Sequence, residues 1–527
     1  MRSLIHFQLL NNNLSGSIPE TIGKLGNLTI LFLSGNNITG PVPSSIGNLS
    51  KINELYLHQN KLTGSIPKEM GRLGLLAYLS LIENSLEGSL PIEMKNLTSL
   101  TSLQLNDNQF VGQLPPDICN GRVLKYFGAA NNHFTGPIPQ SLKNCTSLYR
   151  VRLQNNLLKD NITDVLGTYP YLDYLELSNN ELYVELPPRL GDWSNLTSLK
   201  ISDNKLSGKI PPDLGKMTQL HVLHVSSNNL VGEIPKELGK LQPLLELWLD
   251  GNHLAGSIPR EIGALSDLNQ INVAGNKLSG SIPRELGQCL NLQYVNLSRN
   301  NLEQSIPIEI GNLHSLQSLN LSRNLLTGDI PLQLGTLHSL ETLNLSHNQL
   351  SGSISPTLDA MTSLTYVDVS YNELEGPLPN IPAFHNATMA AIRENKGLCE
   401  NIMGLTHCPG TETKGKDGDK NLLLILLPTS GCLLALFLLV GVSCIIYRRT
   451  RQGETDLIEA SSKSMLEIWS YDGRTVYKNI IEATEAFDAK YCIGVGGQGS
   501  VYKVKLQTGE IVAVKNLNGA PDVEMAS

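Results

Sequence analysis

The chain has 527 residues, with 40 lysines and arginines against 48 aspartates and glutamates, and its formal net charge is −8. This acidic balance leaves no basic footprint, so we exclude nucleic acid as a partner. The eight cysteines are too few and too scattered to indicate a disulfide framework, and the sequence suggests no metal site. Met1 to Leu4 leads straight into a repeat without a signal peptide, which indicates either a cytosolic protein or a chain that begins late.

Asparagine recurs at a fixed interval from Asn12 to Asn372. Each of sixteen asparagines lies twenty-four positions after the one before, with no insertion or deletion between them: Asn12, Asn36, Asn60, Asn84, Asn108, Asn132, Asn156, Asn180, Asn204, Asn228, Asn252, Asn276, Asn300, Asn324, Asn348 and Asn372. Self-similarity at a fixed period of this length predicts a solenoid of stacked units. We call this series the asparagine ladder.

Each unit follows one template, as residues 28–49 illustrate. Leu31 and Leu33 alternate as in a short strand with one buried face. Asn36 can supply both a donor and an acceptor to the buried turn that follows, and Gly40 permits a tight backbone. These spacings resemble the plant-type leucine-rich repeat, LxxLxLxxNxLxGxIPxxIGxL. The resemblance implies an α/β solenoid over residues 1–380, a right-handed superhelix with parallel strands on its concave side.

Some repeats depart from the template. The glycine position is occupied by Asp160, Val184 and Gln304, and the proline position by Thr163 and Ser355. Several of these departures fall between residues 156 and 187, so we expect the solenoid to be least regular there.

Two cysteines fall in a position that leucine holds in most repeats. Cys145 and Cys289 each lie thirteen residues after a ladder asparagine. We therefore predict that both are buried thiols that pack as small apolar groups.

The residues four and six before each ladder asparagine are expected to point away from the core. In the last repeats they are repetitive, but in the middle repeats they are diverse and large: Tyr126, Arg150, Arg152, Tyr174, Glu176, Lys200, His224, Glu246 and Trp248. Aromatic and arginine side chains on a rigid concave surface suit recognition of an extended ligand, and arginine can bind a carboxylate with two hydrogen bonds. We predict a peptide site across roughly residues 100–255, at Tyr126, Arg150, Arg152, Tyr174, Glu176, His224 and Trp248. The alternative is a solvated face with ordinary variation.

Twelve Asn-x-Ser/Thr sequons all precede residue 420: Asn13, Asn27, Asn37, Asn48, Asn96, Asn144, Asn161, Asn195, Asn296, Asn320, Asn344 and Asn386. Their distribution is typical of a secreted ectodomain. Glycans at Asn296, Asn320 and Asn344 would cover the concave face of the later repeats.

The pattern stops after Asn372. Residues 395–399, Asn-Lys-Gly-Leu-Cys, are followed by Cys408 and resemble the carboxy-terminal cap of plant repeat ectodomains. The resemblance implies a Cys399–Cys408 disulfide, formed in an oxidising compartment. We therefore assign residues 381–420 to a cap and linker.

Residues 421–447 form a long apolar run without a single charge. A membrane span needs about 20 apolar residues, so we predict one transmembrane helix rather than a buried core helix. Arg448, Arg449 and Arg451 follow at once and mark the cytoplasmic side. The repeats are then expected outside the cell, and residues 448–488 form a juxtamembrane segment.

Residues 489–527 carry a glycine-rich motif. Gly494, Gly496, Gly499 and Val501 fit G-x-G-x-x-G-x-V, and Lys515 ends a Val-Ala-Val-Lys run at the spacing of a protein-kinase third strand. These residues resemble an incomplete kinase N-lobe, and the resemblance implies ATP with Mg²⁺ as the ligand. Because the site is incomplete, we expect the printed chain to bind ATP weakly, if at all. A dinucleotide-binding loop is disfavoured, because β-branched residues rather than a helix follow the glycines. The printed chain contains no catalytic-loop aspartate and no Asp-Phe-Gly, so we expect that it does not transfer phosphate by itself.

The whole layout resembles the plant leucine-rich-repeat receptor-like serine/threonine protein kinases, and segments such as 141–148 and 468–473 resemble the branch of MDIS-interacting receptor-like kinases. The resemblance implies a single-pass plasma-membrane receptor that binds a secreted peptide and associates with a co-receptor kinase. It departs at both ends, with no signal peptide or N-terminal cap in front and most of the kinase missing behind. The alternative is a kinase-dead binding protein, decoy or co-receptor.

Overall fold

The computed structural model describes residues 3–399, 492–496, 499–505 and 511–516. The chain divides into two compact units, Met1–Thr411 and Glu412–Ser527. Within the described ranges no helix is both long enough and apolar enough to cross a membrane. The predicted span, 421–447, and the juxtamembrane segment, 448–488, lie outside those ranges.

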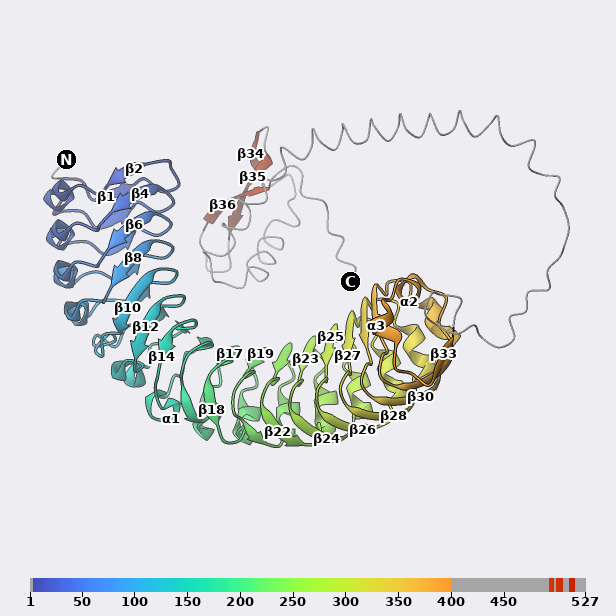
Figure 1. Ribbon diagram of the computed structural model, residues 1–527. Coiled ribbons are helices and arrows are strands. Elements are labelled where there is room, and N and C mark those ends of the chain that lie inside the picture. The colour runs from blue at the N-terminus through green and yellow to red at the C-terminus, as the bar shows by residue number, and fades with distance from the viewer. Residues whose placement is uncertain (1–2, 400–491, 497–498, 506–510, 517–527) are drawn as a thin grey trace, which may run out of the picture. The chain divides into compact units, whose positions relative to one another are not determined.

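The first unit is a solenoid built on one long parallel sheet. Each repeat contributes one short strand, and the sixteen strands pair in chain order, each residue with its equivalent in the next repeat. The strands are β1 (His6–Gln8), β3 (Ile30–Phe32), β5 (Glu54–Tyr56), β7 (Tyr78–Ser80), β9 (Ser102–Gln104), β11 (Tyr126–Gly128), β13 (Arg150–Arg152), β15 (Tyr174–Glu176), β17 (Ser198–Lys200), β19 (Val222–His224), β21 (Glu246–Trp248), β23 (Gln270–Asn272), β25 (Tyr294–Asn296), β27 (Ser318–Asn320), β29 (Thr342–Asn344) and β31 (Tyr366–Asp368). The predicted repeat solenoid is thus confirmed, and this sheet follows the inner side of the arc near β23–β27 (Figure 1).

A second strand follows the ladder asparagine in each repeat. These strands form three further parallel sheets, which are interrupted on both sides of the β16–β18 pair. The strands are β2 (Ser15–Ser17), β4 (Asn37–Gly40), β6 (Lys61–Gly64), β8 (Ser85–Gly88), β10 (Gln109–Gln113), β12 (His133–Gly136), β14 (Leu157–Leu158), β16 (Tyr183–Glu185), β18 (Lys205–Ser207), β20 (Val231–Gly232), β22 (His253–Gly256), β24 (Lys277–Ser281), β26 (Asn301–Gln304), β28 (Leu325–Asp329), β30 (Gln349–Ser353), β32 (Glu373–Pro377) and β33 (Gly397–Cys399).

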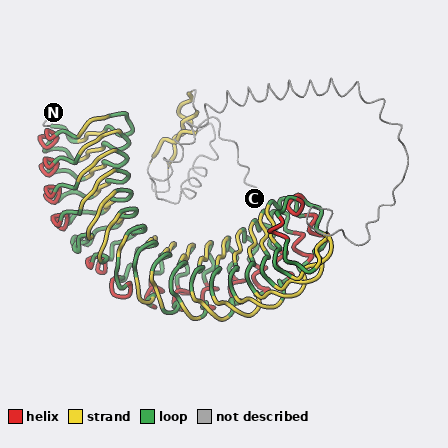
Figure 2. The backbone as a smooth tube through the Cα atoms, viewed as in Figure 1, coloured by secondary structure: helices red, strands yellow, loops and turns green. Residues whose placement is uncertain are grey.

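Short 3₁₀ helices complete most repeats (Figure 2). They are η1 (Glu20–Lys24), η2 (Ser44–Asn48), η3 (Lys68–Arg72), η4 (Ile92–Asn96), η5 (Gln140–Asn144), η6 (Pro188–Asp192), η7 (Pro212–Lys216), η8 (Lys236–Lys240), η9 (Arg260–Ala264), η10 (Arg284–Gln288), η11 (Ile308–Asn312), η12 (Leu332–Thr336) and η13 (Pro356–Ala360). An extended proline precedes most of them, as Pro43 does for η2. Ser355 replaces that proline before η13, and its hydroxyl accepts the Thr357 N–H at 3.2 Å, which caps the helix in another way.

The ladder asparagines join neighbouring repeats. The Nδ2 group of Asn252 donates to the carbonyls of Leu249 at 3.0 Å and Val225 at 3.0 Å. Its Oδ1 accepts the N–H of Leu230 at 3.0 Å. Val225 and Leu230 belong to the preceding repeat, and Asn252 is buried. The predicted role as both donor and acceptor is therefore confirmed, and two of the four bonds of Asn252 cross to the preceding repeat.

The solenoid is least regular where the template is broken, as predicted. Between β14 and β16 the chain forms the short helix α1 (Ile162–Val165), which Asn161 caps by accepting the Thr163 N–H at 3.0 Å. Val184 keeps the glycine conformation with φ of 75°, although its β-branched side chain disfavours it. Gln304, which replaces the template glycine in a later repeat, also has a positive φ, of 66°.

The prediction that Cys145 is a free thiol was wrong. Cys145 is buried, but it forms a disulfide with Cys119, with Cα atoms 6.1 Å apart. Cys119 lies in the repeat before that of Cys145, at a position that glycine holds in many repeats. The two cysteines therefore do not share a template position, and spacing from the ladder could not predict that they pair. Cys289 is a free, buried thiol, as predicted.

The ladder also continues one step further than the sequence indicated. Asn395, which follows Asn372 at an interval one position shorter than the regular one, accepts the N–H of Leu374 at 3.1 Å and donates to the carbonyl of Val369 at 3.1 Å. It follows α2 (Pro382–His385) and α3 (Met389–Ile392) and precedes β33. Cys399 on β33 is disulfide-bonded. Its expected partner, Cys408, lies outside the described residues.

The described part of the second unit is a three-stranded antiparallel sheet. It consists of β34 (Cys492–Gly496), β35 (Gly499–Lys505) and β36 (Ile511–Asn516). In its register Val501 lies opposite both Gly494 on β34 and Lys515 on β36.

Candidate functional site

The predicted ligand residues lie in two rows on the long sheet. Arg152, Glu176, Lys200, His224 and Trp248 are register partners on the neighbouring strands β13 to β21. Adjacent strands lie about 4.8 Å apart, so these side chains form a continuous row. Tyr126, Arg150 and Tyr174 belong to a second, parallel row two residues earlier. The structure therefore brings the predicted residues together on one face.

Arg150 organises the first half of this face. Its Nη2 atom lies 3.5 Å from Oδ2 of Asp173, and its guanidinium lies 4.8 Å from the centre of the Tyr174 ring. The Tyr174 hydroxyl donates to Oε2 of the buried Glu176 at 3.2 Å. Burial and the Glu176 carboxylate raise the pKa of Tyr174 to about 12, so this hydroxyl keeps its proton and stays a donor. Tyr126 packs edge-on against Tyr149, with ring centres 5.7 Å apart.

His224 and Trp248 organise the second half. Their rings stack with centres 4.3 Å apart and planes within 11°. Nε2 of His224 lies 2.9 Å from Oε2 of Glu246. The hydrogen bond from His224 lowers the pKa of Glu246, which keeps that carboxylate ionised. The imidazole is buried, so the stack and the hydrogen bond hold one fixed arrangement.

Several buried polar atoms of this face have no partner within the protein. In the part of the chain that the structure describes, six buried side-chain N or O atoms make no hydrogen bond. Four of the six lie here: Arg152 Nε, Gln154 Oε1, Ser198 Oγ and Trp248 Nε1. Each such atom costs roughly 1–3 kcal/mol while it stays unpaired. Together they comprise donors and an acceptor, which a peptide backbone could satisfy where the side chains that enclose them move aside.

Some members of the face were not predicted from the sequence. Gln154 and Ser198 are neither large nor charged, so the sequence gives no signal for them. The predicted range, residues 100–255, also leaves out the N-terminal repeats, where Phe32 packs edge-on against Tyr56 with ring centres 4.5 Å apart and Tyr56 packs against His58 with ring centres 5.9 Å apart. Phe32 and Tyr56 hold the same position in their repeats as Arg152, so counting from the ladder would have found them.

His58 is the half-buried titratable group of this N-terminal cluster. Its Nδ1 atom is buried without a hydrogen-bond partner. Burial lowers the pKa of His58 to about 4, so the imidazole is neutral near neutral pH.

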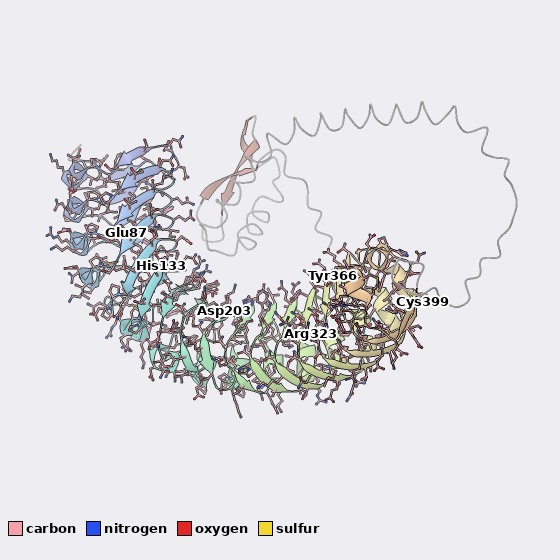
Figure 3. All side chains as sticks on the ribbon, in the orientation of Figure 1. Glu87, His133, Asp203, Arg323, Tyr366 and Cys399 are labelled. Carbon is pink, nitrogen blue, oxygen red and sulfur yellow. A yellow bond between two sulfur atoms is a disulfide. The ribbon has the colours of Figure 1, made fainter. Side chains whose placement is uncertain are left out.

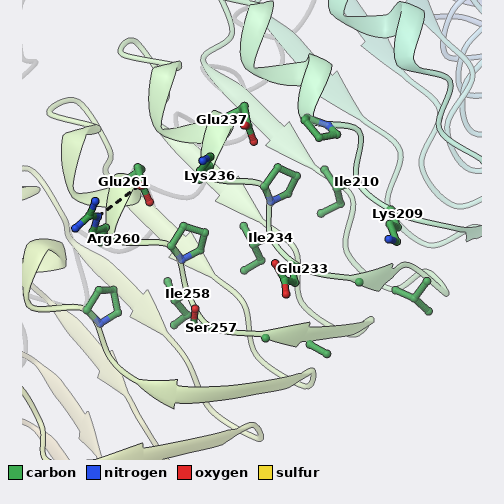
Figure 4. A pocket seen from close by; sticks show the side chains of 18 of the residues that line it. Lys209, Ile210, Glu233, Ile234, Lys236, Glu237, Ser257, Ile258, Arg260 and Glu261 are labelled. Carbon is green, nitrogen blue, oxygen red and sulfur yellow. Dashed lines mark ion pairs between the residues drawn. The ribbon is translucent and has the colours of Figure 1, made fainter.

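A groove with a volume of about 1710 Å³ lies elsewhere on the solenoid, along the Ile-Pro segments between the second strands and the 3₁₀ helices (Figure 4). Its isoleucines, such as Ile234 and Ile258, are buried. Its exposed side chains alternate in charge, and Arg260 pairs with Glu261 at 3.5 Å. This mixture favours no single kind of ligand.

Comparisons with known proteins agree with the fold. A family model described as "Leucine Rich Repeat" matches residues 3–25, 27–49, 51–73, 99–120 and 291–313. A second, "Leucine Rich repeats (2 copies)", matches residues 194–240. A third, "Leucine rich repeat", matches residues 316–374.

Two curated relatives come from Arabidopsis thaliana. The MDIS1-interacting receptor like kinase 2 is 40% identical over 149 residues, and phytosulfokine receptor 1 is 36% identical over 99 residues. These matches cover 28% and 16% of this chain, and 14% and 10% of the relatives' own lengths.

Two solved structures share the fold of the repeats. The plant peptide hormone receptor RGFR1 in complex with RGF2 is 35% identical, with a TM-score of 0.64, over 74% of this chain and 70% of that one. The PEPR1–AtPEP1 structure is 32% identical, with a TM-score of 0.62, over 76% of this chain and 63% of that one. With its repeats, its relatives and its structural neighbours in agreement, the chain belongs to the family of plant leucine-rich-repeat receptor-like kinases.

Proposed function

We propose that this chain is a cell-surface receptor whose middle repeats bind an extracellular peptide. The observation that carries the proposal is the group of four buried, unpartnered polar atoms at Arg152, Gln154, Ser198 and Trp248. They lie among fixed aromatic and charged side chains, which is an arrangement suited to a ligand that supplies its own donors and acceptors. The likeness to the two peptide-receptor structures supports the same assignment.

The two halves of the face suit different parts of a peptide. Arg150 and Arg152 can bind a carboxylate, with Tyr174 holding the Arg150 guanidinium from one side. The ionised Glu246 and the stacked Trp248 can receive a basic or aromatic side chain. Because the contacts within each half already exist, little side-chain freedom is lost on binding.

The remaining parts of the function follow from the sequence. Residues 421–447 would anchor the chain in the plasma membrane, with the glycosylated repeats outside and the C-terminal part in the cytoplasm. The peptide would bring a co-receptor kinase to the complex, and the cytoplasmic serine/threonine kinase would then be activated by proximity.

In the second unit Gly494, Gly496, Gly499, Val501 and Lys515 would hold ATP with Mg²⁺. The glycine-bearing strands and the lysine strand share one sheet, which fits that role. When bound, ATP supplies the phosphoryl group. The glycines would approach its phosphates with backbone N–H groups, and Lys515 would pair with the α- and β-phosphates.

Selection of peptides from a displayed random library tests the peptide site. Peptides that bind the full chain should lose about tenfold or more in affinity to the Arg150→Ala/Arg152→Ala variant. The matched control, Arg260→Ala/Arg284→Ala, removes two exposed arginines from the other groove and should bind as wild type does. Equal affinity of all three proteins would contradict the proposal.

A further inference from the structure

The N-terminal repeats carry a group of aromatic and aliphatic side chains on the long sheet. It consists of Ile30 and Phe32 on β3, Tyr56 at the end of β5, His58 just after it, and Tyr78 on β7. Phe32 is the register partner of Tyr56. Ile30 lies in the neighbouring row, two strands away from Tyr78. All five residues are half-buried, so part of each remains open to solvent. We call these five residues the aromatic patch.

The aromatic patch is fixed by its own packing and is uncharged. The rings of Phe32 and Tyr56 lie edge-on with centres 4.5 Å apart, and those of Tyr56 and His58 with centres 5.9 Å apart. Burial lowers the pKa of His58 to about 4 and raises that of Tyr56 to about 12, so both rings are neutral near neutral pH. Neutral rings that already hold their positions suit an apolar or aromatic side chain of a ligand rather than a charged one.

The aromatic patch is continuous with the face of the middle repeats. The row that contains Tyr56 runs through Ser80, Gln104 and Gly128 to Arg152. The three residues between are small or polar and carry no charge. The Gln104 carboxamide lies over Gly128, where a Cβ would collide with it. An extended backbone can therefore cross this stretch of the row without meeting a bulky side chain, and it finds amide groups to which it can hydrogen-bond.

The distance between the two ends of this row fits a short peptide. Tyr56 on β5 and Arg152 on β13 are separated by four strand-to-strand steps. At about 4.8 Å for each step, the separation is about 19 Å. An extended peptide advances by about 3.3 Å for each residue, so about six residues span it.

We propose that the peptide ligand carries an aromatic or large aliphatic side chain that packs on the aromatic patch, about six residues from the acidic group that Arg150 and Arg152 bind. This inference rests on the proposed function and adds to it an apolar subsite that selects among acidic peptides. The occupant is a segment of the same peptide, because the patch and the arginines lie on one face with an unobstructed row between them.

Affinity measurements with peptides selected from the displayed library test the proposal. The Phe32→Gln/Tyr56→Gln variant introduces the residue type that Gln104 has at the same position of its repeat, so the repeat template is kept. We expect a selected peptide to bind this variant about tenfold or more weakly than wild type, because aromatic anchors contribute much of the affinity of an interface. The matched control, Tyr294→Gln/Tyr366→Gln, removes two aromatic rings from later strands of the same sheet, where Tyr366 is labelled in Figure 3. It should bind within twofold of wild type.

A double-mutant cycle locates the apolar side chain of the peptide. Replacing that residue of the peptide by alanine should weaken binding to wild type by about tenfold, but should cause little further loss in the Phe32→Gln/Tyr56→Gln variant. Replacing the acidic residue of the peptide should weaken binding to both proteins. Additive losses for the protein variant and the apolar residue would overturn the proposal, because that side chain would then bind elsewhere.

The outcomes separate this inference from the proposed function. Peptides that lose affinity only for the Arg150→Ala/Arg152→Ala variant would overturn the inference and leave the proposed function in place. Peptides that lose affinity only for the Phe32→Gln/Tyr56→Gln variant, or for neither variant, would contradict both. Sedimentation of the full chain without peptide tests a second copy as the occupant. We expect the same oligomeric state for wild type and the Phe32→Gln/Tyr56→Gln variant, and a dimer that only wild type forms would overturn the inference.

Discussion

At the scale of single residues, burial decides which side chains of the long sheet are charged. Tyr174 keeps its proton because it is buried beside Glu176, and Glu246 stays ionised because His224 hydrogen-bonds to it. His58 is held neutral by burial alone. These states depend on packing within and between neighbouring repeats, so sequence spacing places the side chains without revealing their protonation.

His58 should make the N-terminal repeats sensitive to acid. Its pKa in the folded protein is about 4, below the ordinary value of 6.5. Between these values the unfolded chain binds the proton and the folded chain does not, so stability falls as the pH drops through this window. When the pH falls from 7 to 4.5, the free energy of unfolding should decrease in both proteins. We expect the decrease for His58→Gln to be roughly 1–3 kcal/mol smaller than for wild type. Urea unfolding at the two pH values measures this, and an identical loss in both proteins would contradict it.

Cys289 should be chemically inert while the protein is folded. Burial raises the pKa of its thiol to about 11, and the side chain is inaccessible. Iodoacetamide should therefore label Cys289 only after unfolding, and a non-reducing digest should contain a peptide pair joined through Cys119 and Cys145. Mass spectrometry detects both, and labelling of Cys145 in the native, unreduced protein would rule out the disulfide.

At the scale of the repeat element, the ladder asparagine and the glycine after it control how units stack. The asparagine satisfies backbone groups of two repeats, and the glycine takes a left-handed turn. Where the glycine is replaced by Val184, the second sheet is interrupted and α1 appears one repeat earlier. Regular repeats could be predicted because each depends on its own template. The form of the irregular repeat could not, because it depends on new contacts such as the cap of α1 by Asn161.

Removing one ladder asparagine should destabilise the solenoid locally. Asn252→Ala leaves the N–H of Leu230 without its partner, while the carbonyls of Val225 and Leu249 keep their bonds from Asn228 and Asn276. We expect a loss of about 1–3 kcal/mol, the cost of one buried unpaired group. Asn312→Ala, at an exposed position at the end of η11, is the control and should change stability by less than about 0.5 kcal/mol. Thermal and urea unfolding compare them, and similar losses in both variants would contradict the assigned role.

Relieving the strained turn should have the opposite effect. Val184→Gly removes a β-branched side chain from a backbone with φ of 75°, so we expect stabilisation by about 1 kcal/mol. Gly280→Val is the reverse change at a regular turn with φ of 74°, where an added Cβ would find its nearest neighbour 3.7 Å away. It should destabilise by a similar or larger amount. A lower unfolding midpoint for Val184→Gly would show that the valine packing outweighs the strain.

At the scale of the whole molecule, the repeat separates structural positions from recognition positions. Counting from the ladder predicted the solenoid and correctly placed Arg150, Arg152, His224 and Trp248 on one face. It did not predict Asn395, because the last interval is one position short, nor the unpartnered atoms of Gln154 and Ser198. These atoms lack a partner because no neighbouring side chain comes within hydrogen-bond distance of them, and those distances are known only from the packed structure. The roles of Gly494 and Lys515 in ATP binding stay predictions.

Hydrogen–deuterium exchange with a library-selected peptide tests the central claim most directly. If the peptide binds across the middle repeats, backbone amides of β13 to β21 should gain protection, while those of β25 to β31 and of the Ile-Pro groove should not change. The Arg150→Ala/Arg152→Ala variant should show no protection at the same peptide concentration. Protection confined to the later repeats or to the groove would contradict the account, because the ligand would then bind away from the unpartnered atoms.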